Sequence, residues 1–481
     1  MSYKAMREFL PVLERSGKLK RISKRVDRSW EPACLAKWMF QALPPEERFG
    51  FFFEHVTGSD IPLVTAALGA STQTYAAALG TSPEEINAKW MEAFLHPMAP
   101  RIVSAAPCQE VVLEGKEAQL GRLPIPTWTP AKDAGPYITT IVVTRNASEG
   151  FQNQGVYRTQ VLDDHSVVIN LNPGRQGYLC CRSFTDRGEP APIAWVVAAP
   201  PAVHLATVAN LPYGSEEIRL AGGLMGEPVE MVKAKTIDLL VPAHAEIVIE
   251  AEIRPNDFAD EGPFGEFAGF MSPVTRKPVA RIKAITHRKS PIYYGLTSQM
   301  PPSESTTIQS LTNAAMLLKI LRCDLSETSV SDVHIDLTFG GLLAHCIIAM
   351  APQYPGHGKR VGRLIADMTP LKRVTVVDRD VDIRDPLHVD WALNALFDAK
   401  RDTVIIDDVY FPLDMDPAVR GAQTLGAASS KMVLDATQKI DAGTFSLPPK
   451  EMMMRALDVW RETGLPEFRI PKRARLRLER S

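Results

Sequence analysis

The stretch EGPFGEFAGF, residues 261–270, places two carboxylates five positions apart around a bend. Pro263 fixes its own φ angle and disfavours a helical conformation for Gly262, while Gly265 permits close approach of a neighbouring segment. Glu261 and Glu266 could then converge on one ligand. The alternative is a surface turn whose acids aid solubility, because Gly and Pro are common in turns. Residues elsewhere in the chain must separate these two interpretations.

The composition is typical of a globular protein. A length of 481 residues predicts about three domains, and 45% hydrophobic residues are enough to form their cores. The net charge of −2 favours neither nucleic acid nor a membrane surface as a partner. The longest apolar stretch, near residues 339–352, is too short to cross a bilayer, and no signal-like segment opens the chain. We therefore expect a soluble, cytoplasmic protein.

The six cysteines are too sparse for a disulfide framework and lack the CxxC spacing of zinc sites. We expect the adjacent Cys180 and Cys181 to be core thiols. The C-terminus is the one strongly charged segment, since RIPKRARLRLERS at 469–481 has six basic residues and one acid. This composition predicts a solvated tail or an arm that contacts a neighbouring subunit.

Hydrophobic patterns divide the chain into segments. Residues 1–105 predict an α/β segment, with a helix in SPEEINAKWMEAFLHP that has Ser82 as N-cap, Pro83 at its first position and Glu85 completing a capping box. Residues 106–300 contain short β-branched runs separated by Pro and Gly, which predict a β-barrel or similarly closed sheet. These runs are YITTIVVTR, SVVINLN, IAWVVAAP, EIVIEAEI, VARIKAITH and IYYGLT.

The last third of the chain has a different pattern. Residues 301–325 predict a long linker helix, and residues 326–460 alternate strand-like and helical patterns. This alternation predicts an α/β domain with a largely parallel sheet. Residues 461–481 form the basic tail. The fold class is therefore α+β or α/β, with several domains.

Several familiar catalytic patterns are absent from the sequence. PGHGKRVG, residues 355–362, lacks the glycine and lysine spacing of a phosphate-binding loop. No HExxH or GxSxG motif occurs, which disfavours zinc proteases and α/β-hydrolases. We expect His287, His334 and His345 to be structural.

A combination of segments indicates chemistry. FQNQGVYRTQ, residues 151–160, contains Asn153 and Arg158, and Glu217 precedes a Gly-rich stretch. An arginine can keep one carboxylate ionised while a drier neighbour stays protonable, so an Arg and two Glu residues could deliver a proton. Each residue taken alone is more often a surface ion-pair partner, and only the combination favours a functional role. Because five positions along a regular strand separate opposite faces, we expect a bulge at Gly155 to align Asn153 with Arg158.

Over roughly residues 5–450 the chain resembles the UbiD family of decarboxylases, which use prenylated flavin mononucleotide (FMN). The resemblance implies a central flavin-reductase-like split β-barrel, flanked by an N-terminal α/β segment and a C-terminal α/β dimerisation domain. The matching segments are SAAPCQEVV, NQGVYRTQ, RGEPAPIAWVVAAPPA, EPVEMVKAKTIDLLVPAHAEIVIE, EGPFGEFAGF, VVDRDVDIRDPLHVDWAL and SSKMVLDATQK.

The resemblance also implies site residues. The family's catalytic Glu-Arg-Glu set falls on Glu261, Arg158 and Glu266, with Glu266 as the proton donor. Its divalent metal, Mn²⁺ or Mg²⁺, is held by an Asn, a His and a Glu; Asn153 and Glu217 match two of them. Gln176 stands where the family has His, and an amide oxygen suits these hard cations. The cofactor-binding residues implied in this way are Asn153, Val156, Tyr157, Arg158, Gln176, Glu217 and Lys431. A K⁺ site is implied near residues 206–209.

The implied reaction is the reversible, non-oxidative decarboxylation of an aromatic, heteroaromatic or α,β-unsaturated acid through a covalent adduct with the prenylated flavin. Loss of CO₂ leaves an electron pair that side chains cannot absorb, so a cofactor must accept it. Residues 298–310 are implied near the substrate, although Ser303, Ser305 and Thr306 suit helix capping better. A flavin prenyltransferase would supply the cofactor, and a homodimer or hexamer is implied. Two alternatives remain open: a flavin oxidoreductase and a non-catalytic assembly protein.

Overall fold

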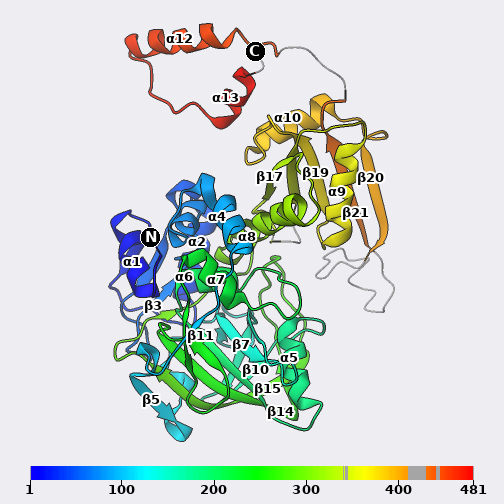
Figure 1. The fold of residues 1–481 in the computed structure, drawn as a ribbon. Coiled ribbons are helices and arrows are strands. Elements are labelled where there is room, and N and C mark those ends of the chain that lie inside the picture. Colours follow the sequence, from blue (N-terminus) through cyan, green and yellow to red (C-terminus); the bar gives the residue numbers. More distant parts are fainter. Residues whose placement is uncertain (1, 340, 342–344, 410–428, 440–444, 480–481) are drawn as a thin grey trace. The chain divides into compact units, whose positions relative to one another are not determined.

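The computed structural model describes residues 2–339, 341, 345–409, 429–439 and 445–479, and these form two compact units. The first comprises Met1–Met316 with Leu337–Gly341, and the second Leu317–Asp336 with Leu342–Ser481. Figure 1 shows the elements of each unit coloured along the chain. Among the described residues, no helix combines the length and apolar character that crossing a bilayer demands.

The N-terminal segment of the first unit has a four-stranded mixed sheet with strand order β1-β2-β3-β16. Its last strand comes from IYYGLT, which we expected in the barrel. That expectation was wrong, because β16 pairs with β3 in parallel. Both tyrosines of β16 are completely buried, and a fully buried run does not reveal which sheet it joins. The strands are β1 (Leu19–Ile22), β2 (Gly50–Phe53), β3 (Leu63–Thr65) and β16 (Tyr293–Tyr294), and the helices are α1 (Met6–Arg15), α2 (Glu31–Ala42), α3 (Thr72–Ala78) and α4 (Ile86–Leu95).

The predicted capping box before α4 does not form. Pro83–Glu85 is a 3₁₀ turn that leads into α4, and the Ser82 side chain makes no capping hydrogen bond there. Glu85 instead accepts a hydrogen bond from the Thr81 hydroxyl at 3.1 Å. The sequence pattern located the start of the helix. The Glu85 carboxylate, however, is hydrogen-bonded to the hydroxyl of Thr81, one residue before the predicted N-cap.

A nine-stranded antiparallel sheet dominates the first unit. Its strand order is β6-β9-β10-β15-β14-β11-β7-β8, with β5 paired to β15. The end strands β6 and β8 are not paired with each other, so the sheet is a half-barrel and not the closed sheet that we expected. The strands are β5 (Val111–Glu114), β6 (Tyr137–Ile138), β7 (Ile141–Arg145), β8 (Gln152–Val156), β9 (Thr159–Asp163), β10 (Ser166–Ile169), β11 (Ala191–Val197), β14 (Ile247–Glu261) and β15 (Thr275–His287).

Helices pack against this half-barrel sheet. Helix α5 packs on β7, β8 and β11, and α7 contacts β8. Cys180 and Cys181 lie buried on α5 without a disulfide, as expected for core thiols. The remaining elements are α5 (Gln176–Thr185), α6 (Pro201–Ala206), α7 (Glu217–Met225), and a small sheet of β4 (Arg101–Val103), β12 (Glu230–Lys233) and β13 (Leu240–Pro242).

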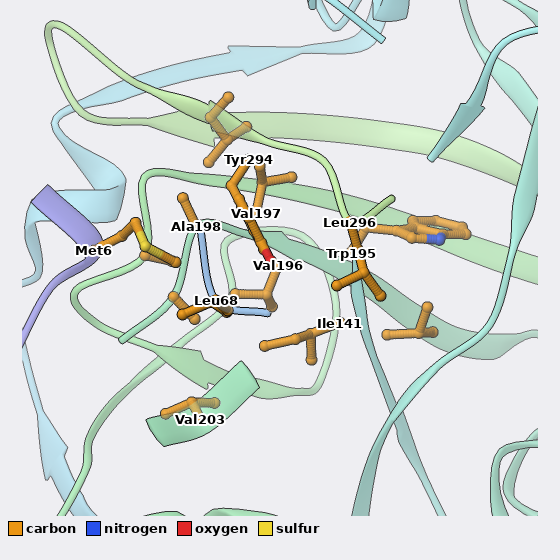
Figure 2. Close-up of a cluster of buried hydrophobic side chains, with 14 of the residues drawn as sticks. Met6, Leu68, Ile141, Trp195, Val196, Val197, Ala198, Val203, Tyr294 and Leu296 are labelled. Carbon is orange, nitrogen blue, oxygen red and sulfur yellow. The ribbon is translucent and has the colours of Figure 1, made fainter. Parts of the chain in front are cut away.

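The main core of this unit surrounds β11, whose seven residues are all buried. Figure 2 shows Trp195, Val196 and Val197 of this strand among side chains from distant segments, including Met6 and Leu68. The Trp195 indole N–H donates to the Thr159 hydroxyl at 2.8 Å. Burial of this strand therefore ties the N-terminal segment to the half-barrel.

The second unit has a five-stranded sheet with order β17-β18-β19-β21-β20. The three central strands are parallel and both edge strands are antiparallel, so the sheet is mixed where we predicted a largely parallel one. Helix α9 packs on β19 and β21. The strands are β17 (Val330–Ile335), β18 (His345–Met350), β19 (Arg373–Asp378), β20 (Thr403–Val409) and β21 (Ser429–Ala436), and the helices are α9 (His357–Met368), α10 (Pro386–Leu396), α12 (Lys450–Glu462) and α13 (Lys472–Leu478).

The basic C-terminus is not a solvated tail in the described part of the chain. It forms α13, and Arg473 donates to the Asp385 carboxylate before α10 at 2.5 Å. The Arg477 guanidinium carbon lies 5.1 Å from the centre of the Trp391 ring. The segment therefore packs on its own unit, and contact with a neighbouring subunit stays a prediction.

The predicted linker helix is α8 (Glu304–Lys319), which starts with a fully buried acid. Glu304 accepts hydrogen bonds from the backbone N–H groups of Ala66, Leu68 and Thr297 at 2.9 to 3.1 Å, and from the Tyr294 hydroxyl at 2.7 Å. Burial raises the pKa of this carboxyl group, and the hydrogen bonds oppose that effect. One side chain thus links α8, β16 and the N-terminal segment.

We predict that Glu304→Ala destabilises the first unit by about 3 kcal/mol or more, because several buried donors lose their acceptor. Urea unfolding followed by tryptophan fluorescence measures this change. Glu84→Ala, at an exposed acid, is the matched control and should leave the midpoint unchanged. Equal midpoints for the two variants would contradict the assigned role of Glu304.

Candidate active site

The stretch EGPFGEFAGF forms a bend at the end of β14. Glu261 is the last residue of that strand, and Gly262 follows with a φ of +97°, a conformation that favours glycine. A Cβ on Gly262 would also lie 2.9 Å from the Pro273 carbonyl oxygen. The Glu266 backbone N–H then donates to the Phe270 carbonyl at 2.8 Å, which closes a second, tight turn.

The predicted close approach at Gly265 is present. A Cβ there would lie 2.2 Å from the Thr129 hydroxyl oxygen, so any side chain would displace the 129–134 loop. That loop also holds the bend through hydrogen bonds. The Asp133 carboxylate accepts from the Gly265 N–H, and the Ala134 N–H donates to the Pro263 carbonyl, both at 2.9 Å.

Arg158 brings the two carboxylates of the bend together. Its Nε and Nη2 donate to the two oxygens of Glu261 at 2.8 and 2.9 Å, which is a bidentate pair. Its Nη1 donates to Oε1 of Glu266. The structure therefore assembles the predicted Glu-Arg-Glu set, and the interpretation of the bend as a simple surface turn is excluded.

The two acids differ in their access to a ligand. The Glu261 side chain is completely buried, whereas Glu266 retains 13% of its exposure and Arg158 11%. Burial acts to lower the pKa of the Arg158 guanidinium, but the hydrogen bonds and charges of Glu261 and Glu266 outweigh it and raise that pKa. The guanidinium is thus a fixed cation, and Glu266 is the acid that a ligand can reach.

Other residues around Arg158 have no local sequence signal. The Tyr137 hydroxyl lies 3.2 Å from both the Gln160 and the Glu261 side-chain oxygens, and the Ser272 hydroxyl accepts from Arg158 at 3.2 Å. The Phe264 ring centre lies 5.1 Å from the guanidinium carbon of Arg158. These contacts come from segments far apart in sequence, so only the folded chain reveals them.

Asn153 and Glu217, two of the residues predicted as metal ligands, lie side by side. Asn153 Nδ2 donates to Glu217 Oε1 at 3.0 Å, and the Gln154 backbone N–H donates to Glu217 Oε2 at 2.8 Å. Glu217 opens α7 and Asn153 lies on β8, and both side chains are buried. Burial raises the pKa of the Glu217 carboxyl group to about 7, although these hydrogen bonds oppose the rise.

Gln176, the third predicted ligand, has a different contact. Its amide oxygen accepts from the Gly214 N–H at 3.3 Å. Tyr157 connects the two regions, because its hydroxyl donates to Asn153 Oδ1 at 3.0 Å and accepts from the Gly177 N–H at 3.1 Å. Among the described residues, no cluster of three or more His, Cys, Asp or Glu side chains could hold a metal. A metal beside Asn153 would therefore depend on amide oxygens.

The bulge that we predicted at Gly155 is wrong. The pairing of β7 with β8 is regular from Gln152 to Val156, and Arg158 lies beyond the strand, in the connection to β9. The connection turns the chain and so frees Arg158 from strand alternation. Gly155 has a different role, since a Cβ there would lie 2.8 Å from the ring of Tyr157.

The remaining predicted residues have structural contacts. Lys431 on β21 is buried and donates to the Ala366 and Thr369 carbonyls at 2.8 and 2.5 Å, so its binding of a phosphate stays a prediction. Ser303 and Thr306 exchange backbone-to-hydroxyl hydrogen bonds at the start of α8, which confirms their capping role. His287 and His345 are also hydrogen-bonded structural residues.

Comparison with known protein families shows which family has domains similar to those of this chain. A family model described as the 3-octaprenyl-4-hydroxybenzoate carboxy-lyase Rift-related domain matches residues 101–301. Models of the C-terminal and N-terminal domains of the same carboxy-lyase match residues 306–436 and 10–94. The chain belongs to the UbiD family. It is accordingly a decarboxylase, that is, a carboxy-lyase. This family assignment does not support the two alternatives, a flavin oxidoreductase and a non-catalytic assembly protein.

Solved structures of UbiD-class enzymes share the fold of this UbiD family member. HmfF from Pelotomaculum thermopropionicum, in complex with FMN, is 33% identical over 92% of this chain and 97% of its own, with a TM-score of 0.82. An evolved dimeric form of HmfF in complex with prenylated FMN is 32% identical over 93% and 97%, with a TM-score of 0.81. Vanillic acid decarboxylase from Sedimentibacter hydroxybenzoicus, in closed form, is 28% identical over 96% and 100%, with a TM-score of 0.83.

The buried Glu217 gives a pH-dependent prediction for the metal-free protein. Its folded-state pKa of about 7 exceeds its ordinary value of 4.5, so its contribution to stability is full below pH 4.5 and is lost as the pH rises through 7. Glu217→Gln should therefore gain up to about 3 kcal/mol over the wild type between pH 5 and pH 8. Urea unfolding with a chelator present measures the difference, and a constant difference across this range would contradict the burial argument.

Proposed function

We propose that this protein catalyses the reversible, non-oxidative decarboxylation of an aromatic, heteroaromatic or α,β-unsaturated carboxylic acid with prenylated FMN. The observation that carries the proposal is the Arg158 cation, bound through two hydrogen bonds to the buried Glu261 and through one to the more accessible Glu266. Such a set holds one acid as a fixed counter-ion and leaves the other to exchange a proton with a ligand.

The donor set beside this network suits a phosphate-bearing cofactor held through a metal. Asn153 and Glu217 are in direct contact, and Mn²⁺ or Mg²⁺ accepts amide and carboxylate oxygens, so Asn153 would bind the metal once its Oδ1 turned from the Tyr157 hydroxyl to the Glu217 side. The metal would neutralise the negative charge of the cofactor phosphate. Gln176 is the predicted third ligand, and its amide oxygen would bind the metal after giving up its hydrogen bond from the Gly214 N–H. Val156 and Tyr157 connect this site to Arg158 along the chain. Backbone oxygens near residues 206–209 would hold K⁺. Lys431 is the residue predicted to contact the phosphate.

The prenylated flavin, when bound, supplies the acceptor for the electron pair that the departing carboxyl group leaves behind. The chain's own residues bind and orient the acid and move one proton. Arg158 has an N–H edge that attracts the substrate carboxylate, and its pairing with Glu261 fixes its direction. Glu266 gives its proton to the carbon that has lost CO₂, and solvent returns a proton to Glu266. In the carboxylation direction Glu266 accepts the proton.

Relatives support the substrate class without naming one compound. The vanillic acid decarboxylase that shares this fold acts on an aromatic acid by its name, and HmfF structures hold FMN or prenylated FMN. We infer that a flavin prenyltransferase supplies the cofactor and that the protein assembles as a homodimer or hexamer. Co-expression with a flavin prenyltransferase, followed by cofactor mass analysis and CO₂ release from a panel of acids, tests this function.

Replacement of the proton donor gives the sharpest test. We predict that Glu266→Gln lowers the turnover number by about 100-fold or more, because loss of a general acid removes a contribution of 10²–10⁴. The flavin content, measured by absorbance and mass, should stay at the wild-type level. Asp260→Asn is a matched control, since Asp260 is an exposed acid beside Glu261. Full activity of the Glu266 variant would reject the assignment.

The metal assignment has its own prediction. Asn153→Ala should weaken Mn²⁺ binding by about 10-fold or more, because it removes one oxygen ligand and a contact that orients Glu217. Electron paramagnetic resonance of free Mn²⁺ during a titration measures the affinity. Asn394→Ala, at an exposed position of α10, serves as the control. Unchanged affinity in the Asn153 variant would place the metal elsewhere.

A further inference from the structure

Residues 298–301 pack directly on the turn that carries Glu266. A Cβ on Gly265 would lie 2.9 Å from Cγ of Gln299, and a Cβ on Gly269 would lie 2.6 Å from the sulfur of Met300. The two glycines flank Glu266 in the sequence. The side chain of Gln299 therefore reaches the residue that immediately precedes the proposed proton donor.

The side-chain amide of Gln299 has a donor nitrogen, Nε2, without a hydrogen-bond partner among the described residues. The residue is only 4% exposed, and its side-chain oxygen accepts from the Ser298 backbone N–H at 3.2 Å. That contact fixes the orientation of the amide, because an N–H must face an oxygen. The other end, Nε2, is buried and has no hydrogen-bond partner among the described residues. An unpaired buried donor costs about 1–3 kcal/mol, so its presence calls for a ligand acceptor.

The side chain of Thr129 lies against Gly265 on the same side as Gln299. The Thr129 hydroxyl oxygen would lie 2.2 Å from a Cβ on Gly265, and the Thr129 side chain faces the Asp133 carboxylate, whose pKa burial raises and Thr129 acts to lower. The Gln299 amide, with its N–H group unpaired among the described residues, therefore lies beside a residue that is already held by the Asp133 loop, just before Glu266.

The backbone around Gln299 is held in an unfavourable conformation. Gln299 has a φ of +69°, which costs a residue other than glycine about 1–2 kcal/mol. Donors from α2 hold the segment on both sides of it. Lys37 Nζ donates to the Ser298 and Met300 carbonyls at 2.5 and 3.1 Å, and Gln41 Nε2 donates to the Pro301 carbonyl at 3.0 Å. The fold thus maintains both a strained backbone and an unpaired amide at one residue.

We propose that Gln299 is a specificity-determining residue that donates a hydrogen bond from Nε2 to an oxygen or nitrogen acceptor on the ring of the acid substrate. The inference rests on the proposed decarboxylation and adds the substrate class, an acid with such an acceptor. A site with a buried donor binds the acceptor-bearing acid and rejects its counterpart without one, which would leave the donor unpaired.

Kinetics of the cofactor-loaded enzyme test the proposal with matched acids, such as furan-2-carboxylate against thiophene-2-carboxylate, or a pyridine carboxylate against benzoate. We expect the wild type to prefer the acceptor-bearing member of a pair in kcat/KM. Gln299→Met, which keeps the shape and removes the donor, should reduce that preference about 10-fold. Gln299→Glu, which replaces the donor with an acceptor, should reduce it at least as much. An unchanged preference in both variants would overturn the proposal.

Thermal unfolding of the full-length protein without substrate gives an independent readout. Gln299→Met should raise the unfolding midpoint, because it removes a buried donor that has no partner. A structural glutamine would lose stability on the same change, and a lowered midpoint would overturn the proposal. Gln73→Met, at an exposed position of α3, should change neither readout. Failure of the enzyme to turn over any acid would contradict the proposed function. A raised unfolding midpoint of Gln299→Met in the same experiment would still show that the donor of Gln299 has no partner in the protein.

Discussion

The bidentate ion pair between Arg158 and the completely buried Glu261 is the constraint on which the site depends. A buried carboxylate without its cation would carry a large desolvation cost, so the two residues must meet whenever the first unit is folded. Since Glu261 ends β14 and Arg158 lies between β8 and β9, their pairing fixes two distant parts of the half-barrel relative to each other. The remaining N–H group of Arg158 then determines where Glu266 lies.

Other acids near the site are also held by hydrogen-bond donors of the chain. Asp133 and Glu217 are buried or half-buried acids that accept backbone N–H groups, from Gly265 and Gln154 respectively. Each one orders a segment next to a functional side chain at the cost of desolvating a carboxylate, which is why burial raises the pKa of both. Buried acids that are paired with backbone donors therefore position Glu266 and Asn153. The amide N–H group of Gln299, unpaired among the described residues, lies next to this scaffold.

Much of the architecture could be predicted from residue patterns. Strands such as β11 and β14 and the helices α8 and α10 lie where periodicity placed them, because burial on one or both faces determines the spacing of apolar residues. Three assignments failed for one reason. The partner of β16, the open edge of the half-barrel and the antiparallel edge strands of the second unit all depend on which strand lies beside which. Local periodicity shows which residues are buried, but it does not specify which strands pair or in which direction they run.

The sequence by itself indicated the family through a series of matching motifs, and with it the Glu-Arg-Glu set, while the bend at Gly262 and Gly265 followed from residue types at short, fixed spacings. Only the tertiary structure decided that Arg158 lies beyond β8 without any bulge, that Gln176 contacts Gly214, and that Glu266 is more accessible than Glu261. Accessibility and hydrogen-bond partners are properties of the packed chain. They arise when segments that are distant in the sequence exclude water together, and no local pattern encodes them.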